Sequence, residues 1–360
     1  MSSQATWVTG IEGNFLLHDA VLKLLPEGTE VISAFSSGVS AWSKTAKVSV
    51  VLPNGSLKRY FLKCVSGESA KALVEGEYQS AYDINQVMSD LVPKPIGWGK
   101  YRSGDTQVYF FLGDFHDMDF SSAPEPAQFT ARIAELHRKG VSPNGMFGYP
   151  VPTVIGIMKR TVTWETSWAK SFTHQLNDAI GYDNQTNAPW PEYDAACKQL
   201  IDAVIPRLLG TLQSDRRHII PVLIHGDLWE RNVGTDRETG KTIVFDPGCT
   251  YAHNEMEFGT WRCSWAFHFN SLDYMKSYQH HIKPSEPADE FDDRNRLYSI
   301  YPYLIESAGH AGSASRQLAY NDLLFLCEKY APLASLDKYN PKMDISVTGA
   351  HVPFVVKQLE

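Results

Sequence analysis

Short stretches in which apolar and polar residues alternate dominate the first third of the chain. The alternation predicts β-strands, and the Asn54-Gly55 pair between two of them is typical of a tight hairpin turn. Two other stretches have apolar residues at helical spacing. We expect strands at 30–35, 47–52, 57–65, 96–101 and 107–112, and helices at 14–25 and 68–88.

Helical spacing takes over after a break at Gly113-Asp114-Phe115, which follows an apolar strand. We expect helices at 126–139, 164–176, 192–213, 255–269, 292–308 and 315–331, and an irregular tail at 336–360. A run of strands followed by a run of helices indicates an α+β fold. We therefore expect a small N-terminal lobe at 1–112, with an antiparallel sheet and one main helix, a hinge at 113–115 and a larger, mostly helical lobe at 116–360.

The composition of the 360 residues is that of an ordinary globular protein, with 43% hydrophobic residues and a formal net charge of −8. A nucleic-acid-binding protein would normally carry a basic surface, so we expect no nucleic-acid partner. The five cysteines are scattered and form no Cys-x-x-Cys pair, which favours a reducing compartment. The chain shows neither a signal-peptide pattern nor an apolar run long enough for a membrane, so we expect a cytoplasmic location.

The most informative stretch runs from 221 to 248 and places three polar side chains beside short predicted strands. Asp227 follows an apolar run, Asn232 comes five residues later, and Asp246 ends another strand. Magnesium at phosphoryl-transfer sites prefers carboxylate and amide oxygens together with water and phosphate. Asn232 and Asp246 are therefore candidate ligands for Mg²⁺, and Asp227 is the candidate base that orients and deprotonates a hydroxyl group.

Protein kinases use the same order of Asp, Asn and Asp, and they also need a lysine for the phosphates of ATP. Lys63 is the candidate for this role. It lies between Phe61 and Val65 on one face of a predicted strand, where a charge requires a partner. That partner would be a glutamate of the helix that follows, and Glu75 and Glu77 are both candidates.

Two further segments are candidates for contact with the nucleotide. Ser37-Gly38-Val39 lies in a turn of small residues between two predicted strands, and such a turn can lay backbone N–H groups over phosphates. A hairpin turn without a ligand would have the same composition. At the hinge, the backbone of Gly113-Asp114-Phe115 is expected to offer N–H and C=O groups to the adenine edge.

The residues around the catalytic stretch narrow the type of kinase. No Arg stands between His225 and Asp227, and the protein-kinase Asp-Phe-Gly is absent. Instead, HGDLWERNVG (225–234) and VFDPGCTYAHNEMEFG (244–259) resemble the fructosamine kinase, or ketosamine-3-kinase, family of the aminoglycoside phosphotransferase-like kinases. The resemblance implies a two-lobed, protein-kinase-like fold that uses ATP and Mg²⁺. It also implies phosphorylation of a sugar hydroxyl on a ketosamine, either glycated lysine or a free amine, in the repair of glycated proteins.

The resemblance also bears on single residues. The segment 74–77 corresponds to the family's Phe-Glu-Gly-Glu, which favours Glu77 over Glu75 as the partner of the lysine. Trp229 is expected to stack on the sugar-derived substrate, where a cationic amine would gain from the ring face. Glu255 and Glu257 could bind that amine or brace the catalytic loop, and the sequence does not separate these roles.

Two other functions also fit these residues. A kinase of another small hydroxyl compound, such as an aminoglycoside or a choline-like amine, would have the same fold and core residues. A catalytically inactive ATP-binding protein would keep the fold without turnover. Trp229 and the segment 253–257 weigh against the first alternative, and the presence of all the core polar residues weighs against the second.

Overall fold

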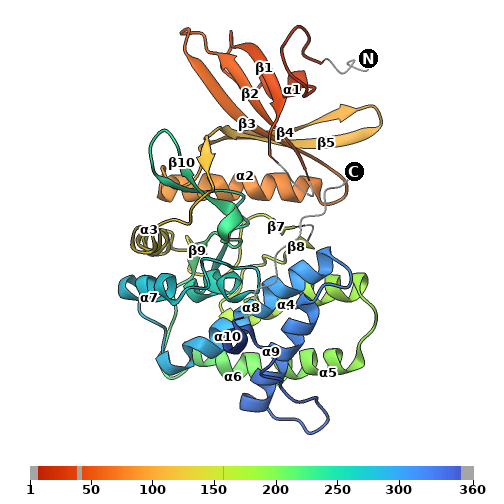
Figure 1. Ribbon diagram of the computed structural model, residues 1–360, viewed down its shortest axis with the longest axis vertical. Coiled ribbons are helices and arrows are strands. Elements are labelled where there is room, and N and C mark those ends of the chain that lie inside the picture. The colour runs from red at the N-terminus through yellow and green to blue at the C-terminus, as the bar shows by residue number, and fades with distance from the viewer. Residues whose placement is uncertain (1–6, 39–42, 157, 350–360) are drawn as a thin grey trace.

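Five antiparallel strands and one long helix form a small lobe, which sits on a larger helical lobe (Figure 1). The computed structural model describes residues 7–38, 43–156 and 158–349. The strands of the sheet, in the order β1-β2-β3-β5-β4, are β1 (Glu30–Ser36), β2 (Lys44–Val51), β3 (Leu57–Ser66), β4 (Pro95–Ser103) and β5 (Thr106–Asp114). The helices of this lobe are α1 (Asp19–Leu22) and α2 (Ala70–Val87). The predicted α+β, two-lobed fold is confirmed.

Alternation along β3 separates two cores and leaves Lys63 on the side of α2. Leu62 and Cys64 pack into the cluster that contains α1 and β2. Phe61 and Val65 pack into a second cluster with residues of α2. Because successive side chains of a strand point to opposite faces, Lys63 shares the face of Phe61 and Val65, as predicted. It is buried there, with 7% of its surface exposed.

The helix expected at 14–25 is confined to α1, because the residues before it pair with the sheet. The Phe15 N–H donates to the Ala34 carbonyl (3.1 Å), and the Ala34 N–H donates to the Glu12 carbonyl (2.8 Å). Gly13 lies so close to β1 that a Cβ atom would come 1.9 Å from the Ala34 oxygen. Backbone pairing with β1 has therefore replaced the helical hydrogen bonds of this segment.

The large lobe packs around α4 and α8, which contribute the buried aromatic residues Trp168, Phe172 and Tyr298. Its helices are α3 (Pro126–Lys139), α4 (Trp168–Thr186), α5 (Pro191–Gln199), α6 (Ile205–Leu208), α7 (Leu272–His281), α8 (Phe291–Gly309), α9 (Ser315–Tyr330) and α10 (Ile345–Thr348). Its short strands are β6 (Met118–Asp119), β7 (Val154–Ile155), β8 (Met158–Lys159), β9 (Val222–Ile224), β10 (Val233–Asp236), β11 (Thr242–Val244) and β12 (Thr250–Ala252). Within the described ranges, none of the helices combines the length and apolar character needed to cross a bilayer.

The helix expected at 192–213 is interrupted by a π-helical turn. It consists of α5, the turn Leu200–Val204, α6 and a 3₁₀ turn at Gly210–Gln213. Pro206 has no N–H to donate, and in a regular α-helix its ring would clash with a carbonyl of the preceding turn. The α-helical geometry is therefore interrupted at this position. The Ile205 N–H donates instead to the Leu200 carbonyl five residues back, which is the widened turn.

The prediction of a helix at 255–269 is wrong, because this segment packs closely on α8 in a different conformation. It contains two 3₁₀ turns, Asn254–Phe258 and Thr260–Arg262. The Phe258 carbonyl accepts from Asn295 Nδ2 of α8 (3.0 Å) rather than from its own segment. A Cβ atom at Gly259 would lie 2.6 Å from the Tyr298 oxygen, also on α8.

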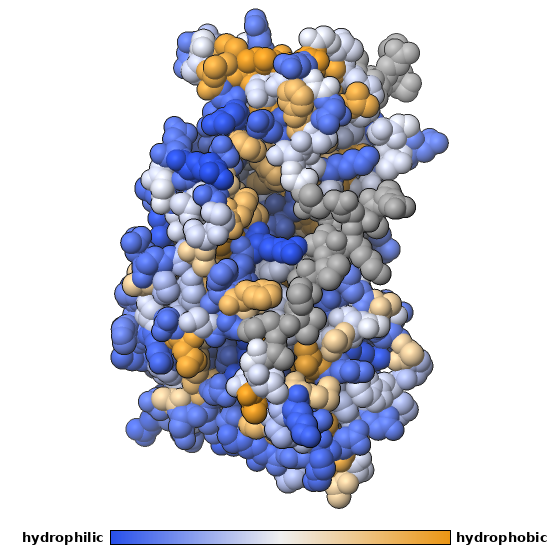
Figure 2. Space-filling view, in the orientation of Figure 1, coloured by the Kyte–Doolittle hydropathy of each residue, from blue (hydrophilic) through white to orange (hydrophobic). Residues whose placement is uncertain are grey.

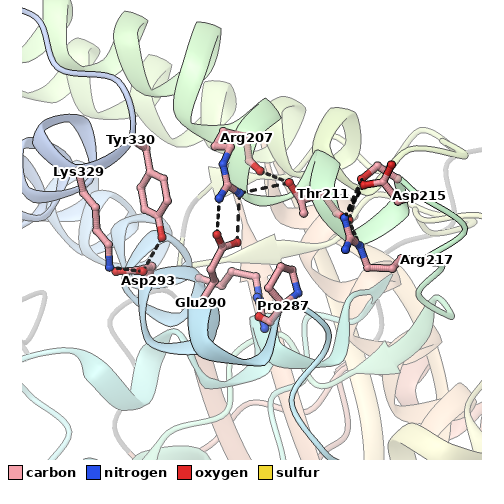
Figure 3. A network of polar contacts seen from close by, with 11 residues as sticks. Arg207, Thr211, Asp215, Arg217, Pro287, Glu290, Asp293, Lys329 and Tyr330 are labelled. Atoms are coloured by element: carbon pink, nitrogen blue, oxygen red, sulfur yellow. Dashed lines mark hydrogen bonds and ion pairs between the residues drawn. The ribbon is translucent and has the colours of Figure 1, made fainter.

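Partly exposed polar contacts join α6, α8 and α9 (Figure 3). Arg207 of α6 forms a two-armed ion pair with Glu290, the residue that precedes α8. Asp293 accepts from Lys329 Nζ (2.7 Å) and from the Tyr330 hydroxyl (2.5 Å) of α9. In both ion pairs the cation is about half exposed, so solvent weakens the pair, and burial of the apolar core contributes most to holding these helices together.

Candidate active site

A cavity of about 620 Å³ lies between the two lobes, and Figure 2 shows the molecule hollowed at this level. Both lobes contribute to its walls. The candidate site residues that line it are Ser37, Gly38, Lys63, Glu77, Gly113, Asp114, Phe115, Asp227, Trp229, Asn232, Asp246 and Glu257. Glu255 does not line it, and Val39 lies outside the described residues. Most of the residues singled out along the sequence are thus brought to one place.

Asp227 is held at the cavity by the loop that follows β9. Asn232 donates through Nδ2 to the Asp227 carbonyl oxygen (2.8 Å) and to Asp227 Oδ2 (2.9 Å). Burial, and then the charge of Asp246, raise the pKa of Asp227 to about 7. A carboxylate with this pKa is suited to accept a proton near neutral pH.

His225 connects the segment of Asp227 with that of Asp246. The Asp227 N–H donates to His225 Nδ1 (3.3 Å), and His225 Nε2 is 3.0 Å from the Phe245 carbonyl oxygen. Because Nδ1 accepts, we assign the ring proton to Nε2. Burial lowers the pKa of His225, which keeps the ring in this neutral form. The contacts make His225 a brace of the loop.

Lys63 lies between two carboxylates, one from each lobe. Its Nζ atom is 2.8 Å from Glu77 Oε2 on α2 and 2.5 Å from Asp246 Oδ1. Glu75 pairs instead with Lys71 of the same helix, at 3.7 Å. Of the two glutamates that the sequence proposed, Glu77 is therefore the one that contacts Lys63.

The charges of these three groups depend on one another. Burial alone would lower the pKa of Lys63, but Asp246 and Glu77 raise it above its usual value. Burial raises the pKa of Glu77 to about 7, although Lys63 opposes the shift. Asp246 is the most open of the three, with 47% of its side chain exposed, and Lys63 outweighs desolvation to hold its pKa below the ordinary value. Lys63 and Asp246 therefore stay charged at neutral pH.

The backbone at Asp246 is in an unusual conformation that a buried arginine supports. Asp246 has a φ of +57°, in the left-handed region that residues with a Cβ atom rarely occupy. Two residues later, the Gly248 carbonyl accepts from Arg160 Nη2, and Arg160 also donates to Thr153 Oγ1 (3.0 Å). Arg160 is 2% exposed. Sequence reasoning missed it, because a single Arg in an irregular segment carries no pattern.

Glu255 and Glu257 are both buried and contact groups of the large lobe. Glu257 accepts from the N–H groups of His225 (2.6 Å) and Gly226 (2.9 Å). Glu255 accepts from Arg294 Nε (2.7 Å) and Nη2 (3.0 Å). These contacts favour the bracing role for both residues. The expectation that Glu255 binds substrate is corrected, because its carboxylate is turned away from the cavity into a buried ion pair.

The hinge contacts differ from the expected ones because β5 continues to Asp114. The Asp114 N–H donates to the Lys94 carbonyl (2.9 Å), and the Phe115 N–H donates to the Arg59 carbonyl (3.2 Å). Both N–H groups are thus used within the small lobe. The next residues, 116–118, also line the cavity. The Asp117 carbonyl in turn accepts from the Arg237 N–H (2.9 Å), and Met118 pairs with Asp236. Contact between the adenine edge and the carbonyl groups of 113–115 therefore stays a prediction.

One face of α8 forms a wall of the cavity. The helix residues that line it are Tyr298, Tyr301, Pro302, Ile305, Glu306 and Gly309. They recur at intervals of three and four, which places them on one helix face. Trp229 and Trp265 line the cavity as well. The sequence predicted this helix but gave no sign of its exposure to a cavity, because apolar residues in a core and at a ligand site form the same pattern.

The donor set at the cavity fits Mg²⁺. Among the described residues, no three His, Cys, Asp or Glu side chains are grouped as a metal cage. Mg²⁺ at phosphoryl-transfer sites needs only one or two carboxylates, because water and phosphate complete its shell. Asn232 turns its amide nitrogen toward Asp227, so its amide oxygen is the atom to accompany the open carboxylate of Asp246.

Comparison with known proteins adds a separate line of argument. A family model described as fructosamine kinase matches residues 43–321. A chloroplastic protein-ribulosamine 3-kinase of Oryza sativa subsp. indica is 29% identical over 263 residues, which cover 71% of this chain and 70% of that protein. The ketosamine-3-kinase of Mus musculus is 25% identical over 292 residues, which cover 73% and 86%. A solved structure from Thermobifida fusca YX-ER1, described as a fructosamine-3-kinase, has a TM-score of 0.66 at 19% identity and covers 86% of this chain and 98% of that chain, which shows a shared fold.

Proposed function

The chain belongs to the fructosamine kinase family, and from this premise we propose that it transfers a phosphoryl group from ATP to a sugar hydroxyl of a ketosamine. The acceptor would be a ribulosamine or fructosamine on lysine or on a free amine, and the reaction would serve the repair of glycated proteins. The observation that carries the proposal is the meeting of Asp227, Asn232, Asp246 and Lys63 at one cavity between the lobes.

Each of these residues has a role in the proposed reaction. Asp227 orients the acceptor hydroxyl and takes its proton. Asn232 holds Asp227 through its amide nitrogen and, with Asp246, offers oxygen ligands to Mg²⁺. Lys63, paired with Glu77, faces the phosphates and compensates their negative charge. When bound, ATP and Mg²⁺ supply the phosphoryl group and neutralise the charge that develops during its transfer.

We further propose that the two lobes act as a nucleotide-binding unit at 1–112 and a catalytic unit at 116–360, joined at 113–115. This division is supported by the strand pairing. β5 is the last strand of the small-lobe sheet, and β6, which follows it, pairs with β10 of the catalytic stretch.

An assay of the product tests the proposed function. The chain is incubated with ATP, Mg²⁺ and either ribulose-glycated or fructose-glycated lysine, and the phosphorylated ketosamine is identified by mass spectrometry. An aminoglycoside and a choline-like amine serve as competing acceptors. We expect phosphorylation of a ketosamine. If only a competing acceptor is phosphorylated, the assignment of a ketosamine as the substrate is wrong. Nucleotide binding without any phosphorylated product would favour a catalytically inactive protein.

The raised pKa of Asp227 predicts a pH dependence of the reaction. Only the deprotonated carboxylate can accept a proton, so kcat/KM for the acceptor should rise with pH through about 7. The measurement is kcat/KM over a pH series at saturating ATP and Mg²⁺. Since the pKa of Glu77 also lies at about 7, Glu77→Gln is the matched control, and the rise should persist in it. A rise centred near the ordinary aspartate value of 3.8 would contradict the prediction.

Replacing Trp229 with Leu is expected to raise KM for the ketosamine about tenfold and to leave KM for ATP unchanged. The ring lines the cavity, and its centroid lies 5.6 Å from the guanidinium carbon of Arg231, so the ring already has one cation beside it. Initial rates at varied acceptor and varied ATP separate the two constants. Trp229→Phe keeps an aromatic face and should have the smaller effect. Equal changes in both constants would argue against a substrate contact.

A further inference from the structure

Three residues on one face of α2 contact the large lobe. They are Gly76, Ser80 and Asp83, whose spacing of four and three positions places them on one side of the helix. In Figure 1, α2 lies directly above the large lobe, next to β7. Glu77, which reaches Lys63, belongs to the same helix and follows Gly76. The position of Glu77 therefore depends on how this face of α2 packs against the large lobe.

Gly76 is the point of closest approach. A Cβ atom there would lie 2.6 Å from the Pro152 oxygen and 3.0 Å from the Thr153 Cα atom. Both are backbone atoms, which cannot rotate aside as the end of a side chain can. Glycine within a helix costs about 1 kcal/mol relative to alanine, so its use here indicates that the backbone contact requires it.

Ser80 attaches the helix to the segment of Asp246. Its fully buried hydroxyl oxygen accepts from the N–H of Cys249 at 3.0 Å. Cys249 follows Asp246 by three positions. Further along the helix, Asp83 Oδ2 accepts from the Tyr149 hydroxyl at 2.6 Å. α2 is thus joined to the large lobe on both sides of Glu77.

The two attachments converge on the same part of the large lobe. Thr153, which meets Gly76, accepts through Oγ1 from Arg160, and Arg160 donates to the Gly248 carbonyl next to Cys249. One connected set of contacts therefore sets the positions of Glu77 and Asp246, the two carboxylates on Lys63.

We propose that Gly76 and Ser80 are positioning residues, which seat α2 on the large lobe so that Glu77 holds Lys63 in place before the nucleotide binds. The inference rests on the proposed kinase function. Glu77 and Asp246 approach Lys63 Nζ to 2.8 Å and 2.5 Å, so a small displacement of α2 changes both contacts. Displacements of about 1 Å in such sites cost roughly a hundredfold in rate.

Gly76→Ala is the direct test, and Gly181→Ala in α4 is its matched control. Nothing lies within 4 Å of a Cβ atom at Gly181, so alanine there should leave the protein as stable or slightly more stable. We expect Gly76→Ala to weaken the binding of AMP-PNP with Mg²⁺, measured by calorimetry, and to lower kcat by about 10- to 100-fold. KM for the ketosamine should not change. A Gly76→Ala chain that binds and turns over like the parent would overturn the proposal.

A double-mutant cycle with Glu77→Gln separates positioning from general loosening of the fold. If Gly76 acts through Glu77, Gly76→Ala should have little further effect on kcat once Glu77 has been replaced. Independent, additive losses from the two substitutions would refute the inferred role of Gly76.

Ser80→Ala is the second variant if Gly76→Ala does not fold. Its matched control is Ser299→Ala, since Ser299 is also fully buried but its hydroxyl contacts only groups of the large lobe among the described residues, the Arg296 carbonyl (2.8 Å) and Asp322 Oδ2 (3.4 Å). We expect weaker AMP-PNP binding in Ser80→Ala and parent-like binding in Ser299→Ala, whereas equal losses in both would count against the proposal. The nucleotide titration needs no acceptor. Failure of the ketosamine assignment would therefore appear separately, as normal nucleotide binding without product.

Discussion

Asp227→Asn is expected to lower kcat by about 10²- to 10⁴-fold, the usual contribution of a positioned general base. The substitution keeps the shape of the side chain, and the Asn oxygen can still accept from Asn232 Nδ2. Only the capacity to take a proton is lost. KM for ATP should be unchanged, because Lys63 and Asp246 are untouched. Initial rates of phosphorylated product formation provide the measurement.

The same variant is expected to be at least as stable as the parent at pH 8. In the folded chain the pKa of Asp227 is about 7, above the ordinary value of 3.8, so folding favours the protonated form. The stabilisation from that proton is complete below pH 3.8 and is lost as the pH rises through about 7. At pH 8 the parent therefore carries a desolvated charge beside Asp246 that the variant lacks. Urea unfolding at pH 8 tests this, and a clear loss of stability would point to misfolding instead of lost chemistry.

Asp236, at the end of β10 in the same stretch of the chain, is the matched control because its pKa shifts the other way. Contacts with His116 (2.6 Å) and the Thr239 N–H (2.7 Å) overcome desolvation and lower the pKa of Asp236 to about 2. Its stabilisation is present above 3.8 and is lost as the pH falls through about 2. Asp236→Asn should therefore lose about 1.5–3 kcal/mol of stability at neutral pH and keep kcat at saturating ATP. Loss of turnover equal to that of Asp227→Asn would show that the Asp227 effect is not specific.

Arg294→Met is expected to lower the free energy of unfolding by about 3–5 kcal/mol, the largest stability effect that we expect. Arg294 and Glu255 are 0% and 1% exposed, and the substitution would leave the Glu255 carboxylate buried without its counter-charge. The carbonyl groups of Ser285 and Pro287 would also lose their donor. Denaturant unfolding with linear extrapolation measures the change.

Arg207→Met is the control for this prediction, because Arg207 makes an ion pair of similar geometry in a half-exposed position (Figure 3). The Arg207 side chain is 46% exposed and that of Glu290 is 12% exposed, so solvent reaches the pair from one side, and we expect a loss of about 1 kcal/mol. Equal losses in the two variants would contradict the role of burial. In the folded fraction of Arg294→Met, KM for the ketosamine should be unchanged, since Glu255 braces the lobe. A raised KM would restore Glu255 as a substrate contact.

Most of the candidate catalytic residues could be found from the sequence because their chemistry is local. Asp227, Asn232 and Asp246 lie within one stretch of strands and turns, and phosphoryl transfer calls for those residue types in that order. The alternation of side chains along the strand also predicted which face of the sheet carries Lys63. Glu255 and Glu257 show the limit of such reasoning. Whether a carboxylate meets a substrate or a buried arginine depends on a partner elsewhere in the chain, here Arg294.

By itself, the sequence determined the strands of the small lobe, most helices of the large lobe, and the identity of the polar groups at the catalytic loop, because periodicity and turn chemistry act over a few residues. Only the tertiary structure decided which groups meet. Lys63 and Asp246 are 183 positions apart, and no local pattern encodes that contact. Glu75 and Glu77 lie on different sides of α2, and the backbone contact at Gly76 sets which side faces inward. Helix phase, lobe contact and burial are long-range properties, which exist only once the chain has packed.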